Sequence, residues 1–242
     1  MHTLYLGPSW AVQSYESVDG DNDPVKTNLA AELNLINFTS IAQFSNTNLD
    51  QLTAAIKFMG ENPELAPFRI VFVLSNSLKD APNYYNLSPE QFAYKFLVSN
   101  DPIEIVKDLE KLFYKKLNEL DIPIALIGAH TDVVDFDFKE HITIIHPSWQ
   151  NFLGSLCGFN AFFGWPAEIA NLWLQGRLDY TTYIDIVTPS KKVVFEIDRL
   201  SSKWTTMATN KLWTGVHPSI LGNQLFAKEI ANSFNKWIDN AV

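Results

Sequence analysis

The strongest constraint on the fold is an alternation between short apolar runs and amphipathic helical patterns. Residues 68–74 form a nearly continuous apolar run that ends in Ser-Asn-Ser, which is typical of a strand buried on both faces of a parallel sheet. Residues 122–127 form a second such run, closed by Gly-Ala-His. A long amphipathic helix is predicted between the two runs. A buried strand, a helix and a second buried strand are the signature of a βαβ unit.

Three amphipathic helices are predicted from apolar residues that recur at helical spacing. The longest begins at Asp101-Pro102, where an N-cap residue precedes proline at the first helical position. A second spans residues 48–59 with Thr47 or Asn48 as its N-cap, and a third follows Ser219 near the C-terminus. Each helix presents one apolar face, as a helix that packs on a sheet must.

Two further strands complete the predicted sheet. Residues 3–6 are β-prone and stop at Gly7-Pro8, which indicates a strand that feeds a tight turn. Residues 141–145 form another strand, and Pro147 limits it. A length of 242 residues suits one large domain. We therefore expect a single domain over residues 1–242, a three-layer α/β/α sandwich with a mainly parallel, doubly wound sheet.

A segment at about residues 147–180 departs from this alternation because aromatic residues and glycines crowd it. We interpret it as an insertion or helical cap near the edge of the sheet. An aromatic cluster of this kind either belongs to the core or forms a wall for an apolar or sugar-bearing substrate. Its largest side chains are those of Trp149, Phe152, Phe159, Phe162, Phe163, Trp165 and Trp173.

The balance of charge argues against several classes of partner. The chain has 18 Lys and Arg against 27 Asp and Glu, a net charge of −9, whereas nucleic-acid binding draws on clustered cations. No apolar run is long enough for a signal peptide or a membrane span. We therefore expect a soluble, cytoplasmic protein with no nucleic-acid or membrane partner, and its oligomeric state stays open.

No disulfide, metal site or cofactor is expected from the sequence. Cys157 is the only cysteine, so it has no internal partner and cannot hold zinc in a thiolate site. The five histidines show no H-x-x-x-H pair. Asp19, Asp21 and Asp23 alternate but lack the glutamate that closes an EF-hand loop, so we interpret them as a solvated acidic loop.

Polar residues follow three of the predicted strands, at the place where ligands bind in open α/β sheets. Ser9 follows the first strand, Asn76 follows a later one, and His130 and Asp132 follow the next. Singly, these residues have ordinary explanations, because Ser9 suits a helix N-cap and Asn76 suits an Asx turn. Together they would bring a serine, an amide donor and a base to one edge of the sheet.

Three short motifs stand in a defined order along the chain. Gly7-Pro8-Ser9 follows the first strand, Leu74-Ser75-Asn76-Ser77 follows a later strand, and Thr214-Gly215-Val216-His217-Pro218 precedes the last helix, with Gly222 beyond it. In this order they resemble the Gly-Asp-Ser, Gly-x-Asn-Asp and Asp-x-x-His-Pro motifs of the SGNH (GDSL-like) hydrolase family. The resemblance covers nearly the whole chain and implies that family's flavodoxin-like α/β/α sandwich.

The resemblance also implies a role for each matching residue. Ser9 is the expected nucleophile, His217 the expected base and Asn76 an expected oxyanion donor. The family's second motif falls near Ser45, whose backbone N–H is expected to donate to the oxyanion, and Trp10 is expected beside the substrate. The resemblance implies no cofactor.

The chain lacks the acidic residues that the family has in its first and last motifs. Pro8 replaces the aspartate of the first motif, and Thr214 occupies the position of the triad aspartate. His217 must then be oriented by Thr214, by a backbone carbonyl or by a carboxylate from elsewhere. The carboxylates that we consider for that role are those of Asp80, Asp132 and Asp198.

Two functions follow from these observations. The first is hydrolysis of an ester, either an acetylated saccharide or a short acyl ester, by Ser9 and His217. The second is a catalytically silent protein of the same fold that binds a saccharide or a protein partner, which Pro8 and Thr214 favour. An α/β-hydrolase is a poorer match, because Gly7-Pro8-Ser9-Trp10-Ala11 lacks the second glycine of G-x-S-x-G and comes too early in the chain.

Overall fold

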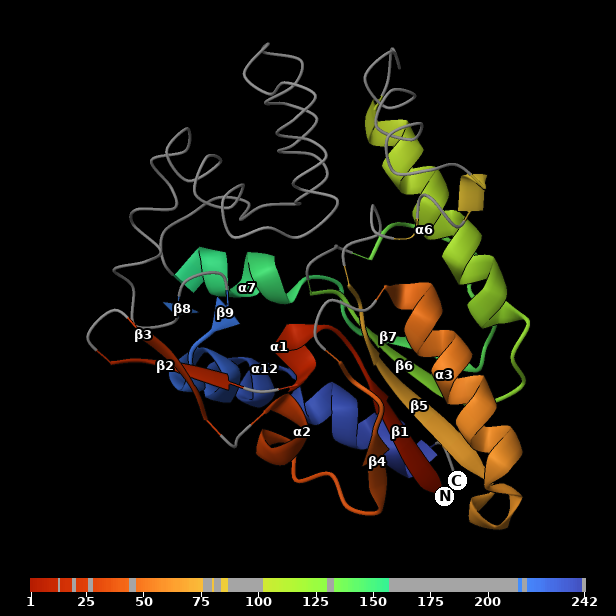
Figure 1. Cartoon of the computed structure of the whole chain (residues 1–242), viewed down its shortest axis with the longest axis horizontal. Coiled ribbons are helices and arrows are strands. Elements are labelled where there is room, and N and C mark those ends of the chain that lie inside the picture. Colours follow the sequence, from red (N-terminus) through yellow and green to blue (C-terminus); the bar gives the residue numbers. More distant parts are fainter. Residues whose placement is uncertain are drawn as a thin grey trace.

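The computed structural model describes residues 1–12, 14–18, 21–25, 28–43, 47–75, 80, 84–86, 102–129, 133–156, 213–214 and 217–240. Its main sheet has five parallel strands in the order β4-β1-β5-β6-β7 (Figure 1). This confirms the predicted α/β fold with a parallel sheet. The strands are β1 (His2–Leu6), β4 (Phe38–Ser40), β5 (Phe68–Val73), β6 (Ile124–Ile127) and β7 (Ile142–His146).

The centre of the sheet is built from β5 and β6, whose residues are all buried. Their apolar runs predict this burial, and the register places Ile70 opposite Ile124. β6 begins at Ile124 rather than at residue 122, because Pro123 has no N–H to donate to a ladder. The Pro123 carbonyl still takes part, since it accepts a hydrogen bond from Ile70 N over 2.9 Å.

The chain reverses its path across the sheet at β1. β4 pairs with one edge of β1 and β5 pairs with the other. Such a reversal opens a crevice outside the carboxyl ends of neighbouring strands, and ligands bind there in open α/β sheets. In this sheet the neighbouring strands are β1, followed by Gly7, and β5, followed by Leu74 and Ser75.

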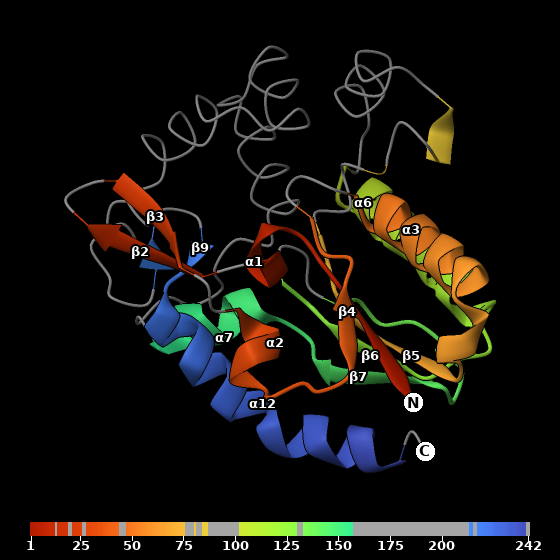
Figure 2. The same cartoon turned by 60° about the horizontal axis from the view of Figure 1, so that its bottom comes forward.

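Helices cover both faces of the sheet, as Figure 2 shows. α3 and α6 lie on one face, whereas α2 and α12 lie on the other. The predicted helices are confirmed, with α6 beginning at Pro102 and α12 directly after Ser219. The bounds of these four helices are α2 (Leu29–Glu32), α3 (Asn48–Glu61), α6 (Pro102–Asn118) and α12 (Ile220–Asn240).

The remaining elements of the described structure are short and lie between or beyond the strands of the main sheet. β2 and β3 pair antiparallel, with Val18 opposite Asp21 and Glu16 opposite Asp23. The interpretation of the acidic stretch as a loop is therefore wrong at Asp21 and Asp23, which belong to strand β3. The short elements are α1 (Ser9–Val12), β2 (Ser14–Val18), β3 (Asp21–Val25), η1 (Pro63–Leu65), α7 (Trp149–Leu156), β8 (Trp213–Thr214) and β9 (His217–Pro218).

The hydrophobic core has a part on each face of the sheet. On the α3 and α6 face, Phe72 packs against Phe113 with ring centroids 5.2 Å apart. On the other face, Trp149 of α7 is fully buried and stacks on Phe226 of α12 at 4.5 Å. Trp149 therefore belongs to the core, which is one of the two interpretations of the aromatic segment. Residues 157–180 of that segment lie outside the described residues.

Candidate functional site

Ser9 stands at the carboxyl edge of the sheet, immediately after β1. The chain leaves β1 at Leu6 and enters α1 at Ser9. Pro8 occupies the cap position, because its carbonyl accepts hydrogen bonds from Ala11 N over 2.8 Å and from Val12 N over 3.3 Å. The N-cap is therefore Pro8, one residue before the position that the alternative interpretation predicted, and Ser9 is the first residue of the helix.

The turn between β1 and α1 depends on Gly7. A Cβ atom at this position would lie 2.8 Å from Val73 Cβ, and closer still to Ala11 Cβ. Both neighbours are themselves Cβ atoms on the backbone of β5 and α1, so neither can rotate away. The absence of a side chain lets the turn that carries Ser9 pack directly against the end of β5.

His217 and Thr214 are register partners in the antiparallel pair of β8 and β9. β9 leads directly into α12 through Ser219, whose hydroxyl accepts a hydrogen bond from Gly222 N over 3.1 Å. β9 also contacts α1, the helix that begins at Ser9. The fold thus brings together two segments from opposite ends of the chain, one carrying the predicted nucleophile and the other the predicted base.

Two buried amide side chains at the start of α3 bind the ends of β1 and β5. Gln51 Oε1 accepts a hydrogen bond from Gly7 N. Asn48 Oδ1 accepts from Ser75 N over 2.7 Å, and Asn48 Nδ2 donates to Ser75 O over 3.3 Å. Neither amide was predicted as a site residue from the sequence, although each occupies an inward position of a helix where apolar residues are usual.

Asp80 anchors the same helix end. Its two carboxylate oxygens accept hydrogen bonds from Asn48 N over 3.1 Å and from Leu49 N over 3.0 Å. Burial raises the pKa of Asp80 to about 6, although hydrogen bonds from the Thr47 side chain and the two N–H groups favour the charged form. Among the described contacts, Asp80 binds α3, and its proposed role beside His217 stays a prediction.

The remaining predicted residues divide into two groups. The structure describes the backbone of Trp10, which is the second residue of α1. Ser45, Asn76, His130, Asp132 and Asp198 lie outside the described residues. The described strands β1, β4, β5 and β6 end at one edge of the sheet, because they are parallel.

His146 is the last residue of β7, at the carboxyl edge of the sheet, and its side chain packs against neighbouring residues. Its ring lies 5.2 Å from the Phe226 ring, and Nδ1 accepts a hydrogen bond from Ser148 N over 3.1 Å. Burial lowers the pKa of His146, and the nearby Glu229 carboxylate only partly opposes that effect. The neutral imidazole thus serves to pack β7 against α12.

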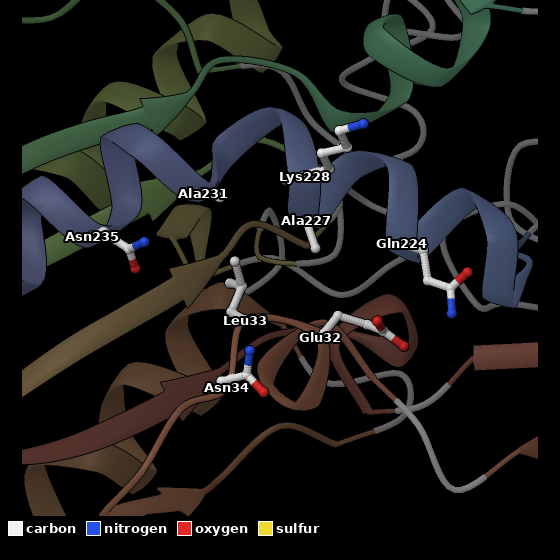
Figure 3. A pocket seen from close by; sticks show the side chains of 8 residues that line it. All are labelled: Glu32, Leu33, Asn34, Gln224, Ala227, Lys228, Ala231 and Asn235. Carbon is white, nitrogen blue, oxygen red and sulfur yellow. The ribbon is translucent and has the colours of Figure 1, made fainter.

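Two cavities lie apart from the predicted site residues. One, of about 470 Å³, lies between α2 and α12, and Figure 3 shows the eight side chains that line it, among them Glu32 and Lys228. The other, of about 440 Å³, lies at the amino edge of the sheet around Arg69 and Ile238. None of the residues predicted for ester hydrolysis lines either cavity.

Other kinds of site find little support in the described part of the chain. No group of three or more His, Cys, Asp or Glu side chains there is arranged to hold a metal ion. No helix within the described ranges has the length and apolar character needed to cross a membrane. Comparisons with protein-family models, curated proteins and solved structures find no match to this chain.

Proposed function

We propose that the chain is a serine ester hydrolase of the SGNH type, built as a three-layer α/β/α sandwich, with Ser9 as nucleophile and His217 as base. The contact between α1 and β9 carries the proposal, because these elements begin at Ser9 and His217. The strand order supports it further, since Ser9 follows β1 at the reversal point where ligands bind.

The proposed chemistry is acyl transfer in two steps. Ser9 Oγ attacks the ester carbonyl while His217 takes its proton and then returns it to the leaving alcohol. A water molecule, activated by His217, then hydrolyses the acyl-enzyme and releases Ser9. The Asn76 amide and the backbone N–H groups near Ser9 and Ser45 stabilise the oxyanion in both steps.

The proposed substrates are an acetylated saccharide or a short acyl ester. Trp10 supports this choice because it is adjacent to Ser9 in α1, and an aromatic side chain beside the nucleophile suits a sugar ring or an acyl chain. The aromatic residues beyond α7 are proposed to contribute further walls.

A second candidate is a silent protein of this fold that binds a saccharide or a protein partner. The register of β8 and β9 favours it, because the residue opposite His217 is Thr214 and not an acid. Without a carboxylate to hold its tautomer, the imidazole is a weaker base.

The two candidates differ in whether Ser9 is activated. We expect the wild type to hydrolyse a short aryl ester and to react with a fluorophosphonate probe, and Ser9→Ala to lose both by about 10³-fold or more. Ser233→Ala is the matched control, because the Ser233 hydroxyl donates to Ile230 O within its own helix, α12. A wild type that the probe does not label, or labelling that persists in Ser9→Ala, would show that Ser9 is not an activated nucleophile and would favour the second candidate, the silent binding protein.

A further inference from the structure

Asn48 and Gln51 occupy neighbouring positions on the buried face of α3. They lie three residues apart, which places them on one side of a helix. Asn48 is 1% exposed and Gln51 is fully buried. Burying a polar amide is costly unless it makes hydrogen bonds. The hydrogen bonds made by these two amides therefore explain why this face of α3 begins with polar residues.

Each amide binds the backbone at the end of a different strand. Gln51 Oε1 accepts from Gly7 N, two residues before Ser9. Asn48 binds both the N–H and the carbonyl of Ser75, the residue before Asn76. Because β1 and β5 are adjacent parallel strands, one helical turn spans the two loops that would carry the nucleophile and the oxyanion amide.

The helix end that supplies these amides is itself held firmly. Thr47 and Asp50 form a capping box, in which Thr47 Oγ1 accepts from Asp50 N over 3.0 Å. The Asp80 carboxylate binds the N–H groups of Asn48 and Leu49. The start of α3 is therefore held in place by several hydrogen bonds, and it can fix the positions of both loops.

The need to give buried backbone groups a hydrogen-bond partner does not by itself explain why both partners come from one helix. The N–H of Gly7 and the N–H and carbonyl of Ser75 need partners because they are buried at strand ends, but separate partners would satisfy them equally well. One helix that supplies both partners also couples the two loops, since a shift of α3 moves both together.

We propose that Asn48 and Gln51 are positioning residues that hold the Ser9 turn and the Asn76 loop at a fixed separation. The inference deepens the proposed hydrolase function and rests on it for its catalytic consequence. A misplacement of about 1 Å can lower turnover by about 10²-fold. Loss of either amide therefore reduces kcat much more than it changes KM.

Kinetic variants separate positioning from general stability. Asn48→Leu and Gln51→Met remove the hydrogen bonds at nearly constant volume, and each is expected to lower kcat for a short aryl ester at least tenfold while KM changes less than about threefold. Leu52→Ala is the matched control, because Leu52 is buried on the same helix in the apolar core. It destabilises the packing of α3 but leaves kcat within about twofold.

A conservative variant tests the hydrogen bond itself. Gln51 Nε2 has no hydrogen-bond partner among the described residues, so Gln51→Glu, which full burial keeps in its neutral carboxyl form, retains an acceptor for Gly7 N and gives up no observed bond. It is expected to retain most of the kcat that Gln51→Met loses. Equal kcat values in Gln51→Met, Asn48→Leu and Leu52→Ala would overturn the positioning role.

Amide hydrogen exchange tests the two tethers without reference to hydrolysis. Exchange at Ser75 in Asn48→Leu, and at Gly7 in Gln51→Met, is expected to quicken about fivefold or more relative to Leu74, whose N–H binds Ile127 O. Unchanged exchange at Gly7 and Ser75 would refute the tethers. A wild type that neither hydrolyses the ester nor reacts with the probe would refute the function, even where exchange confirms the tethers.

Discussion

Arg69 and Thr3 face each other across β5 and β1, and Arg69 Nε donates a hydrogen bond to Thr3 Oγ1 over 2.9 Å. The same guanidinium donates to Ile238 O over 3.1 Å, in the last turn of α12, and lies 5.6 Å from the Trp237 ring. A cation near the last carbonyls of a helix also complements the helix dipole. Arg69 thus joins the centre of the sheet to the C-terminal helix.

Replacement of Arg69 should weaken this junction. Because Arg69→Met leaves Thr3 Oγ1 and Ile238 O without their donor, we expect a loss of about 2 kcal/mol of unfolding free energy in urea denaturation. Lys57→Met is the control, since the exposed pair of Lys57 and Glu61 is 3.8 Å long and surface pairs contribute less than about 1 kcal/mol. Equal stability of the two variants would show that Arg69 does not join these elements.

Gly7 and Gly60 should respond in opposite directions to the same substitution. Gly7→Ala forces a Cβ against Ala11 and Val73, and overpacking of this kind costs about 1 to 3 kcal/mol. Gly60 lies in α3, where an added Cβ would meet only open space, so Gly60→Ala should stabilise the chain by about 0.5 to 1 kcal/mol. Thermal unfolding of both variants tests the pair, and a neutral Gly7→Ala would contradict the tight turn.

Asp80 should make stability depend on pH in a direction opposite to that of most paired acids. Its folded pKa of about 6 exceeds the unfolded value of about 3.9. The folded chain therefore binds this proton more tightly, so the stabilising contribution is full below about pH 4 and is lost as the pH rises through about 6.

The comparison with Asp80→Asn isolates this effect from the other acids of the chain. Between pH 7 and pH 5, the wild type should gain about 1 kcal/mol of unfolding free energy relative to Asp80→Asn, as measured by urea denaturation at each pH. A difference that does not change with pH, or that grows as the pH rises, would show that burial does not raise this pKa.

Local patterns in the sequence were sufficient for the main strands and the long helices. The apolar runs at β5 and β6 and the helical spacing in α6 and α12 are properties of neighbouring residues, so they predict the elements directly. Helical spacing alone did not predict which residues of a helix are buried and which are exposed. Ile56 has the spacing of a core residue in α3 but is 48% exposed, because the inward face of α3 follows Leu52 and Ala55.

Features that depend on distant residues were not predictable in the same way. β4 has only three residues, none of them fully buried, so it lacks a strand pattern and is stabilised by its pairing with β1. Gln51 binds Gly7 from 44 positions away, and Asn48 binds Ser75 from 27 positions away. Their roles emerge only when the sheet brings these segments together, whereas the order of Ser9 and His217 was visible in the motifs.

Thr214 offers the most direct test of how His217 is oriented. The two residues are register partners, and Cβ atoms of directly opposed residues in an antiparallel pair lie about 5 Å apart. A carboxylate at position 214 would therefore stand directly opposite His217 in the register. If no other acid fills that role in the proposed hydrolase, Thr214→Asp should raise ester turnover, because a triad carboxylate holds the tautomer and stabilises the imidazolium.

The outcome depends on whether a carboxylate already serves His217. If Asp80, Asp132 or Asp198 does so, its Asp→Asn variant should lower turnover, and Thr214→Asp should be neutral or harmful because like charges would crowd the imidazole. The measurement is kcat for a short aryl ester across the four single variants, with Thr214→Ser as the control that adds no charge. Unchanged turnover in all four would exclude both kinds of acid and leave a backbone carbonyl as the group that orients His217.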